Sequence, residues 1–221
     1  MKKLLLATAT ALALTSTAYA GDTATLKVVG KLAVGACTPD VNGGATVDYG
    51  TKYISNLNAT SMNDLGVKNT NLTITCTSPT KVAWMAMDDR ADSLETSIIL
   101  SGIPTTADNA FGVGKTAGGV NIGAYTVTVD TSAGVTINGN AANVLVSDND
   151  NASWSTANNP VVRSNGTKIY SLAQTSTSAP DSFMTAVFPL KIELGVQSTN
   201  TLAITDDTNI DGQATITLKY L

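Results

Sequence analysis

The sequence predicts an all-β fold, an antiparallel sandwich or barrel, and three observations lead to that prediction. Short runs rich in β-branched and aromatic residues recur along the chain, and threonine is abundant in them. Gly, Asn, Asp and Ser separate the runs, as in proteins built of short strands and turns. No convincing amphipathic helix follows the N-terminal apolar run. The expected strands are 72–76, 82–87, 97–100, 125–129, 135–137, 144–146, 168–172, 184–196, 201–205 and 214–221.

The chain begins with the features of a secretory signal peptide over residues 1–20. Lys2 and Lys3 precede a short apolar run, and a small-residue motif ends at Ala20. Cleavage is therefore expected between Ala20 and Gly21. The apolar run is shorter than the roughly 18 residues needed to span a membrane, and no later run reaches that length. We expect an exported protein that is soluble or assembled on the cell surface.

Residues 24–36, which we call the N-terminal segment, alternate between apolar and polar positions. This period of two is typical of a strand with one buried and one solvated face, and Lys27 and Lys31 lie on the polar face. Gly30 stands in the middle of the apolar face, where a glycine weakens a strand and offers no side chain to pack. It indicates that the receiving surface has a bulky group at that point. The apolar positions are Leu26, Val28, Gly30, Leu32 and Val34.

The chain after the signal peptide has the length of one β domain and a net negative charge. About 201 residues remain, which is enough for one sandwich or barrel with a core. Eleven basic residues stand against 17 acidic ones once Lys2 and Lys3 are removed, so the net charge is about −6. Nucleic acid is not an expected partner, because phosphate binding requires clustered Lys and Arg.

Two cysteines, Cys37 and Cys76, are present in the whole sequence. In an exported chain they are expected to form a disulfide, because secretory compartments are oxidising. A redox or metal role would require closer spacing or a nearby histidine, and the sequence contains no histidine. We therefore expect a structural disulfide.

The sequence predicts no enzyme, metal site or cofactor. The lack of histidine excludes Ser-His-Asp and Cys-His nucleophiles. Residues 112–119 (GVGKTAGG) lack the first glycine of a phosphate-binding loop, since Asn109 stands at its position. A pair of glycosidase carboxylates would have to come from the acidic residues of 88–95, which we expect to be solvated turn residues.

Residues 147–159 form the most polar stretch and interrupt the rhythm of strands, so we expect a long surface loop. Asp148 and Asp150 lack the glycine and the distant glutamate of a calcium loop. Of the two tryptophans, Trp84 lies in an apolar run and is expected in the core, whereas Trp154 lies in the polar loop.

The C-terminal run 214–221 alternates as regularly as the N-terminal segment. A strand in this position has an edge that must be paired or covered, because exposed backbone groups attract another chain. The pattern alone leaves open whether 25–35 and 214–221 are the first and last strands of a closed sandwich. The apolar face consists of Ala214, Ile216, Leu218 and Tyr220.

Several of these features together resemble chaperone–usher pilins. The run 26–37 resembles the pilin N-terminal extension, an alternating strand with a central glycine that leads into the first cysteine. The alternating end with penultimate Tyr220, the separation of the two cysteines and the stretch 118–123 are also similar to pilins. The chain is longer than a typical major pilin, and Thr208 replaces a frequent pilin glycine. These departures indicate a divergent, fimbria-like branch of poorly characterised proteins.

The resemblance implies an incomplete immunoglobulin-like sandwich over residues 37–221. In pilins the last strand is missing, and residues corresponding here to the extension 21–36 complete a neighbouring subunit. The apolar residues of the N-terminal segment would then enter the groove of that neighbour, with Gly30 at the narrowest point. The resemblance also assigns strand 214–221 to contacts with the chaperone and with the next subunit.

The function that the resemblance implies is that of a structural subunit of a surface fimbria, assembled by donor-strand exchange and supporting adhesion. The implied partners are a periplasmic pilus chaperone, an outer-membrane usher and copies of this or other fimbrial subunits. The protein would pass through the periplasm to the cell surface. The role of major or minor subunit stays open.

Two alternatives remain at the level of the sequence. A self-contained secreted β-sandwich, either a binding module or a hydrolase, would pair residues 24–35 within its own chain and would be stable as a monomer. A receptor-binding adhesin fits less well, because adhesins usually carry a separate N-terminal lectin domain and lack a donor extension.

Overall fold

The computed structural model describes residues 25–32, 35–42, 44–148, 150–175 and 178–221. The chain divides into two units, residues 1–33 and 34–221. The expected signal peptide, its cleavage site at Ala20 and Gly21, and Val34 of the expected donor strand lie outside the described residues. Within the described part, no helix is long and apolar enough to cross a membrane.

Residues 25–32, the described part of the first unit, contain neither helix nor strand. Leu26, Val28 and Leu32 are 86–103% exposed, so three of the predicted apolar positions lie in solvent. A Cβ atom added to Gly30 would meet no atom within 4 Å. Burial within the described structure therefore does not explain why apolar residues alternate in this segment.

The second unit is all-β, as predicted, and all its strand pairs are antiparallel. Its larger sheet, seven-stranded over the described residues, has the order β1-β2-β13-β7-β6, with β8 pairing β13 and β9 pairing β8. These strands are β1 (Cys37–Val41), β2 (Asn63–Thr80), β13 (Phe183–Val196), β7 (Gly123–Val129), β6 (Phe111–Gly112), β8 (Thr136–Ile137) and β9 (Asn140–Ala141).

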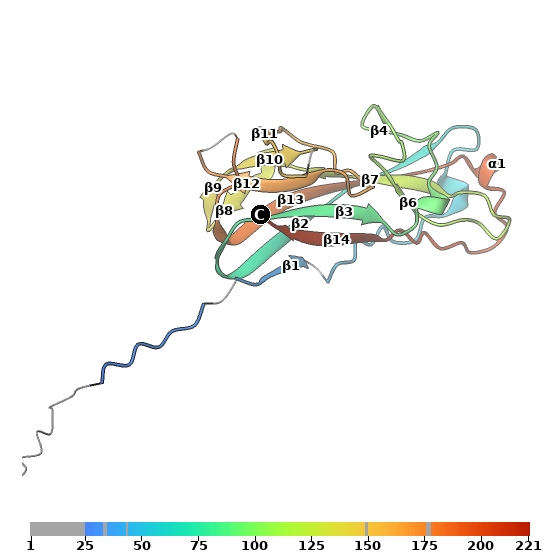
Figure 1. Ribbon diagram of the computed structural model, residues 1–221. Coiled ribbons are helices and arrows are strands. Elements are labelled where there is room, and N and C mark those ends of the chain that lie inside the picture. Colours follow the sequence, from blue (N-terminus) through green and yellow to red (C-terminus); the bar gives the residue numbers. More distant parts are fainter. Residues whose placement is uncertain (1–24, 33–34, 43, 149, 176–177) are drawn as a thin grey trace, which may run out of the picture. The chain divides into compact units, whose positions relative to one another are not determined.

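The smaller sheet has five strands among the described residues, in the order β11-β10-β12-β3-β14 (Figure 1). They are β11 (Ser155–Thr156), β10 (Asn143–Ser147), β12 (Ile169–Ala173), β3 (Val82–Asp88) and β14 (Ala214–Tyr220). The other elements are the pair β4 (Ile99–Leu100) and β5 (Ile103–Pro104), the 3-10 turns η1 (Ile54–Asn56), η2 (Ala91–Ser93) and η3 (Thr131–Ala133), and the helix α1 (Thr199–Leu202).

The two large sheets share one core. Trp84 of β3 stacks on Tyr170 of β12 with ring centroids 4.8 Å apart, and its edge contacts Phe188 of β13 in the other sheet at 5.5 Å. Leu72 and Ile74 of β2 are fully buried in the same cluster. The prediction that Trp84 belongs to the core is thus confirmed.

Two local predictions are wrong. Residues 201–205, expected as a strand, belong instead to α1 and the turn after it. Ser198 caps this helix by accepting a hydrogen bond from the backbone N–H of Thr201 at 3.3 Å, and Leu202 is buried. The polar stretch 147–159, expected to be loop throughout, contains β11, which pairs with β10.

Candidate functional site

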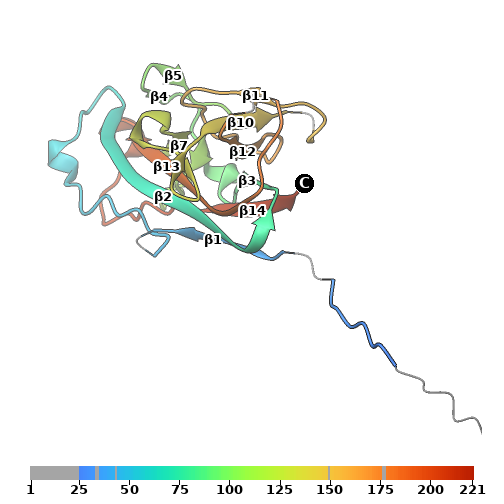
Figure 2. The ribbon, with the colours of Figure 1, turned by 90° about the vertical axis from the view of Figure 1, so that its left-hand side faces the viewer.

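The candidate site lies between the free edges of the two large sheets. In the larger sheet β1 is the outermost strand and pairs with β2, and in the smaller sheet β14 is the outermost strand and pairs with β3. Both edges lie on the lower side of this unit in two views related by a 90° turn (Figures 1 and 2). Among the described residues, β1 pairs with β2 alone and β14 pairs with β3 alone, so the outer edge of each strand has no strand partner.

A groove of about 440 Å³ opens between these edges. Its floor consists of core side chains from both sheets, and its walls are the segment that follows β1 and the segment that leads into β14. The floor residues are Trp84, Ala86, Phe111, Val113, Tyr125, Val127, Val162, Leu190, Ile192 and Leu194. The wall residues are Val41, Ala45, Thr46, Val47, Tyr49 and Thr70 on one side and Ile210, Asp211, Gly212, Gln213, Ala214 and Ile216 on the other.

The first wall forms because strand pairing stops after β1. Gly44 and Ala45 have φ angles of +83° and +60°, which turn the chain away from β2. Tyr49 then closes the wall by donating a hydrogen bond from its hydroxyl to the backbone oxygen of Ile192 at 2.7 Å. Burial, together with the negative charges of Glu193 and Asp64, raises the pKa of Tyr49 to about 12.

The second wall is held by residues 210–213. The backbone N–H of Asp211 donates to the oxygen of Val113 at 2.9 Å, and its carboxylate pairs with Arg90 at 2.8 Å. Gly212 lies so close to the ring of Tyr125 that an added Cβ would stand 2.8 Å from Cε1. These contacts fix the wall against the larger sheet before β14 begins.

The floor contains a buried donor without an acceptor in the described part of the chain. Trp84 is 1% exposed, and its indole N–H has no hydrogen-bond partner. Unpaired buried donors cost roughly 1–3 kcal/mol, so such groups in native proteins require an explanation. The groove thus combines two edges that pair with no third strand among the described residues and a buried donor without a partner in its floor.

The groove is closed at the end where β1 starts and β14 stops. The backbone N–H of Cys37 donates a hydrogen bond to the hydroxyl of Tyr220 at 2.8 Å, which joins the two edges directly. Cys37 also forms the predicted disulfide with Cys76, so β1 is anchored to β2 at the same point. The sequence predicted the disulfide, but it carried no signal for the contact with Tyr220.

The predicted C-terminal contact residues lie along this site. Ala214 and Ile216 line the groove, Leu218 packs against the core, and Tyr220 closes the end. Leu26, Val28, Gly30 and Leu32 belong to the first unit, where they are not part of any strand. Sequence reasoning missed the remaining lining residues, because they come from eight separate stretches that only the fold brings together.

Two backbone donors of the loop 112–119 are engaged by side chains of the same unit. The N–H of Gly112 donates to the carboxylate of Asp88, and the N–H of Gly114 donates to the hydroxyl of Ser93, each at 2.9 Å. Burial raises the pKa of Asp88. Asp89 accepts a hydrogen bond from Thr215 of β14 at 2.9 Å. Asp89 is an exposed turn residue, as expected, whereas Asp88 is the last residue of β3 and is half-buried, so the expectation of a solvated turn residue is wrong for Asp88.

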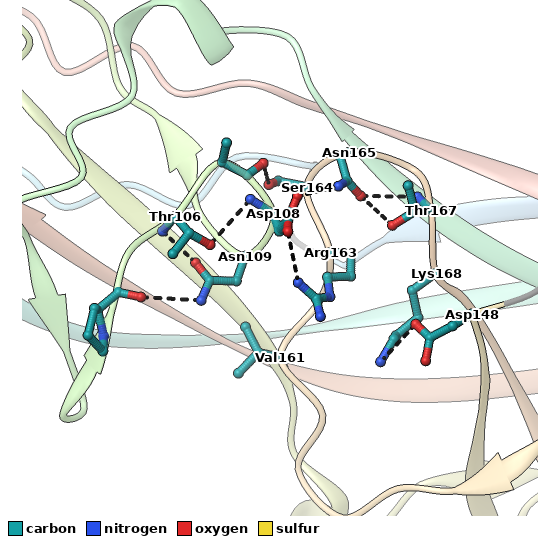
Figure 3. A network of polar contacts seen from close by, with 12 residues as sticks. Thr106, Asp108, Asn109, Asp148, Val161, Arg163, Ser164, Asn165, Thr167 and Lys168 are labelled. Atoms are coloured by element: carbon teal, nitrogen blue, oxygen red, sulfur yellow. Dashed lines mark hydrogen bonds and ion pairs between the residues drawn. The ribbon is translucent and has the colours of Figure 1, made fainter.

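A second polar network surrounds the segment before β12 (Figure 3). Asp108 accepts a hydrogen bond from Asn165 at 2.6 Å and pairs with Arg163 at 3.5 Å. Asn109 caps the adjacent turn through Thr106, and the hydroxyl of Ser164 donates to the backbone oxygen of Ala107. The network positions Val162, which lies in the groove floor. Its role in the described structure is to join loops.

Comparison with known proteins relates most of the chain to Protein GltF of Escherichia coli (strain K12). The two are 33% identical over 223 residues, which cover 89% of this chain and 87% of GltF. The chain belongs to the family of Protein GltF. A second relative, Uncharacterized protein YhcF of the same strain, is 29% identical over 92% of this chain and 93% of its own length. Residues 26–126 match a family described as a protein of unknown function (DUF1120).

The match to the DUF1120 family spans the described part of the N-terminal segment and the first part of the second unit. It starts at Leu26, the first apolar residue of the N-terminal segment, and ends at Thr126 within β7. It therefore contains the described residues 26–32, both cysteines and the whole wall after β1.

Proposed function

We propose that this protein is a structural subunit of a surface fimbria, assembled when the N-terminal segment of one copy fills the groove of another. The observation that carries this proposal is a pair of matching features in one chain. The second unit has an apolar groove between two unpaired sheet edges, and the described residues 25–32 leave alternate apolar side chains in solvent. Addition of a strand to an open sheet edge is a known mode of peptide recognition, with chaperone–pilin complexes among its examples.

The apolar face of the N-terminal segment suits the groove chemically. Leu26, Val28 and Leu32 would leave water and contact floor residues such as Leu190 and Ile192. Burial of each side chain contributes roughly 1.5–3 kcal/mol, and the backbone ladder on both sides adds hydrogen bonds. Gly30 would bring the backbone close to the floor without a side chain to accommodate.

Charge also favours a second copy of this chain as the occupant. The N-terminal segment carries Lys27 and Lys31 and no acidic residue, whereas residues 37–221 contain sixteen acidic and nine basic residues. Asp40, on the edge strand β1, is exposed. A basic segment therefore approaches an acidic acceptor.

The consequence of this pairing is a filament. Each copy donates its segment in one direction and accepts a segment from the other, so the contact is head-to-tail and does not close on itself. In this proposal a periplasmic chaperone fills the groove of the free subunit by pairing with β14. The outer-membrane usher is then the place where the segment of the next subunit replaces the chaperone.

The proposal is tested by electrophoresis of the mature protein, with and without boiling, beside a variant that lacks residues 22–35. We expect a ladder of multimers that stay associated in SDS without boiling and dissociate to monomers on boiling. The truncated variant should form no such multimers. A single monomer band in every lane, from protein that folds without a chaperone, would favour the alternative of a self-contained secreted β-sandwich.

A further inference from the structure

A hydrogen bond between Cys37 and Tyr220 lies at the closed end of the groove. Tyr220 is the last residue of β14 and is 52% exposed, and its hydroxyl accepts a hydrogen bond from the backbone N–H of Cys37 at 2.8 Å. The bond joins the first residue of β1 to the last residue of β14. It therefore connects the two edges between which an incoming strand has to lie.

The donor in this bond belongs to the free edge of β1. The backbone oxygen of Ala36 accepts a hydrogen bond from the N–H of Thr77 at 2.8 Å, so Ala36 faces β2 with its backbone groups. Backbone groups of successive residues in a strand point to opposite sides, and the N–H of Cys37 therefore points away from β2. A strand added to the edge of β1 would use this N–H in its ladder, but the hydroxyl of Tyr220 occupies it.

The open part of the groove is also shorter than the segment proposed to fill it. Residues 210–216 line one wall, whereas Leu218 and Tyr220 do not line the groove. At about 3.3 Å per residue that wall is at most about 20 Å long, and a strand from residue 26 to residue 34 is about 26 Å long. The difference is at least about two residues, so a strand of that length extends past Ile216 into the last four residues of β14, which end at Tyr220.

We propose that the contact between Tyr220 and Cys37 is a latch that must open before a strand can pair along the full length of the groove. This inference rests on the proposed function, because it concerns the regulation of the same site. The latch keeps the two edges together at one end while the groove is open at the other. An incoming strand therefore starts at the wall of residues 210–216 and reaches full length when it displaces the hydroxyl of Tyr220.

The test uses the full mature chain, at a concentration at which it is monomeric, and a fluorescent peptide with the sequence of residues 24–36. Tyr220→Phe keeps the aromatic ring and removes the acceptor oxygen. Tyr53→Phe removes the hydroxyl of another exposed tyrosine, outside the groove lining, and is the matched control. Association rates are measured by fluorescence anisotropy, and thermal unfolding shows whether each variant is folded.

We expect Tyr220→Phe to raise the association rate by about 2- to 10-fold, the range that corresponds to loss of one hydrogen bond of ordinary strength. Tyr53→Phe should leave the rate unchanged. A second readout is amide hydrogen exchange at Cys37, which should become faster in unliganded Tyr220→Phe and stay the same in Tyr53→Phe.

The possible failures are distinguishable. If the peptide binds to the wild-type chain and to Tyr220→Phe at the same rate, the latch is refuted while the proposed function stands. If the peptide binds to none of the chains, the proposed function fails and the latch fails with it. A purely structural role of Tyr220 would lower the unfolding temperature of Tyr220→Phe without raising the association rate, and that result also contradicts the latch.

Discussion

At the scale of single residues, the most informative position is Gly30. It interrupts an otherwise apolar face, and in the described structure it has no contact that requires a glycine. A glycine of this kind, with no neighbouring atom in the free chain, is expected where its lack of a side chain matters only in a complex. The sequence could predict the special status of Gly30, but the groove that we propose it enters is formed by residues that lie far apart along the chain.

Gly30→Leu should prevent strand exchange without affecting the fold, because the added side chain would meet the floor of the groove. The expected result is a chain that unfolds at the wild-type temperature but forms no multimers in unboiled gels. Val29→Leu, a change at an exposed position on the opposite face of the segment, is the matched control and should give a normal ladder. Normal multimers from Gly30→Leu would argue against the assignment of the groove.

Tyr49 should make the free energy of unfolding fall at alkaline pH. Its folded-state pKa of about 12 lies above the usual value of 10.0, so its contribution to stability is present below pH 10 and is lost as the pH rises towards 12. Tyr49→Phe should lower the free energy of unfolding by about 0.5–1.5 kcal/mol at pH 8, because the bond to Ile192 is lost. Urea unfolding at pH 8 and pH 11 should show a smaller alkaline loss in this variant, and an unchanged loss would refute the assignment.

At the scale of elements, the pattern of the sequence located most of the core strands. The run 184–196 corresponds to β13 and 82–87 to β3, because in these two the apolar run reports burial directly. The run 214–221 corresponds to β14, although its residues are only half-buried or exposed. The run 72–76 is only part of β2, which extends from Asn63 to Thr80. Its polar residues are held in the strand by pairing with β13, a partner more than a hundred residues away.

The groove was harder to predict from the sequence than the N-terminal segment and the C-terminal strand β14. The N-terminal segment and β14 have regular patterns, whereas the wall after β1 consists of a turn with little periodicity. Its position depends on the bond from Tyr49 to Ile192 and on backbone turns at Gly44 and Ala45. Contacts of this kind arise from tertiary packing, for which a single sequence has no local pattern.

The disulfide that anchors β1 should matter for both stability and assembly. It closes a loop with a sequence separation of 39 residues and ties the first residue of β1 to β2. Replacement of Cys37 and Cys76 by serine should lower the free energy of unfolding by about 2–5 kcal/mol, as measured by urea unfolding. The same variant should yield fewer multimers, since β1 is one of the two edges that we propose receive the strand. Wild-type stability of this variant would show that β1 is held by its ladder alone.

At the scale of the whole molecule, the charge distribution predicts how assembly responds to salt. Lys27 and Lys31 are separated in sequence from a domain with sixteen acidic and nine basic residues. Exposed charges are screened with a Debye length of about 10 Å at 0.1 M salt, so the association rate of the labelled peptide should fall several-fold as salt increases. A peptide with both lysines changed to glutamine should associate more slowly at low salt and show a flatter dependence. An identical salt dependence of the two peptides would exclude electrostatic steering.

Cysteine cross-linking tests directly whether residues of the N-terminal segment of one copy lie in the groove of another. Copies with Val28→Cys are mixed with copies with Ala214→Cys, at the groove wall, or with Met184→Cys, an exposed position outside the groove lining. After oxidation and denaturation, we expect a disulfide-linked dimer from the mixture of Val28→Cys and Ala214→Cys and little from the mixture with Met184→Cys. Equal dimer yields from the two mixtures, or no dimer from either, would show that the segment of one copy does not lie in the groove of another.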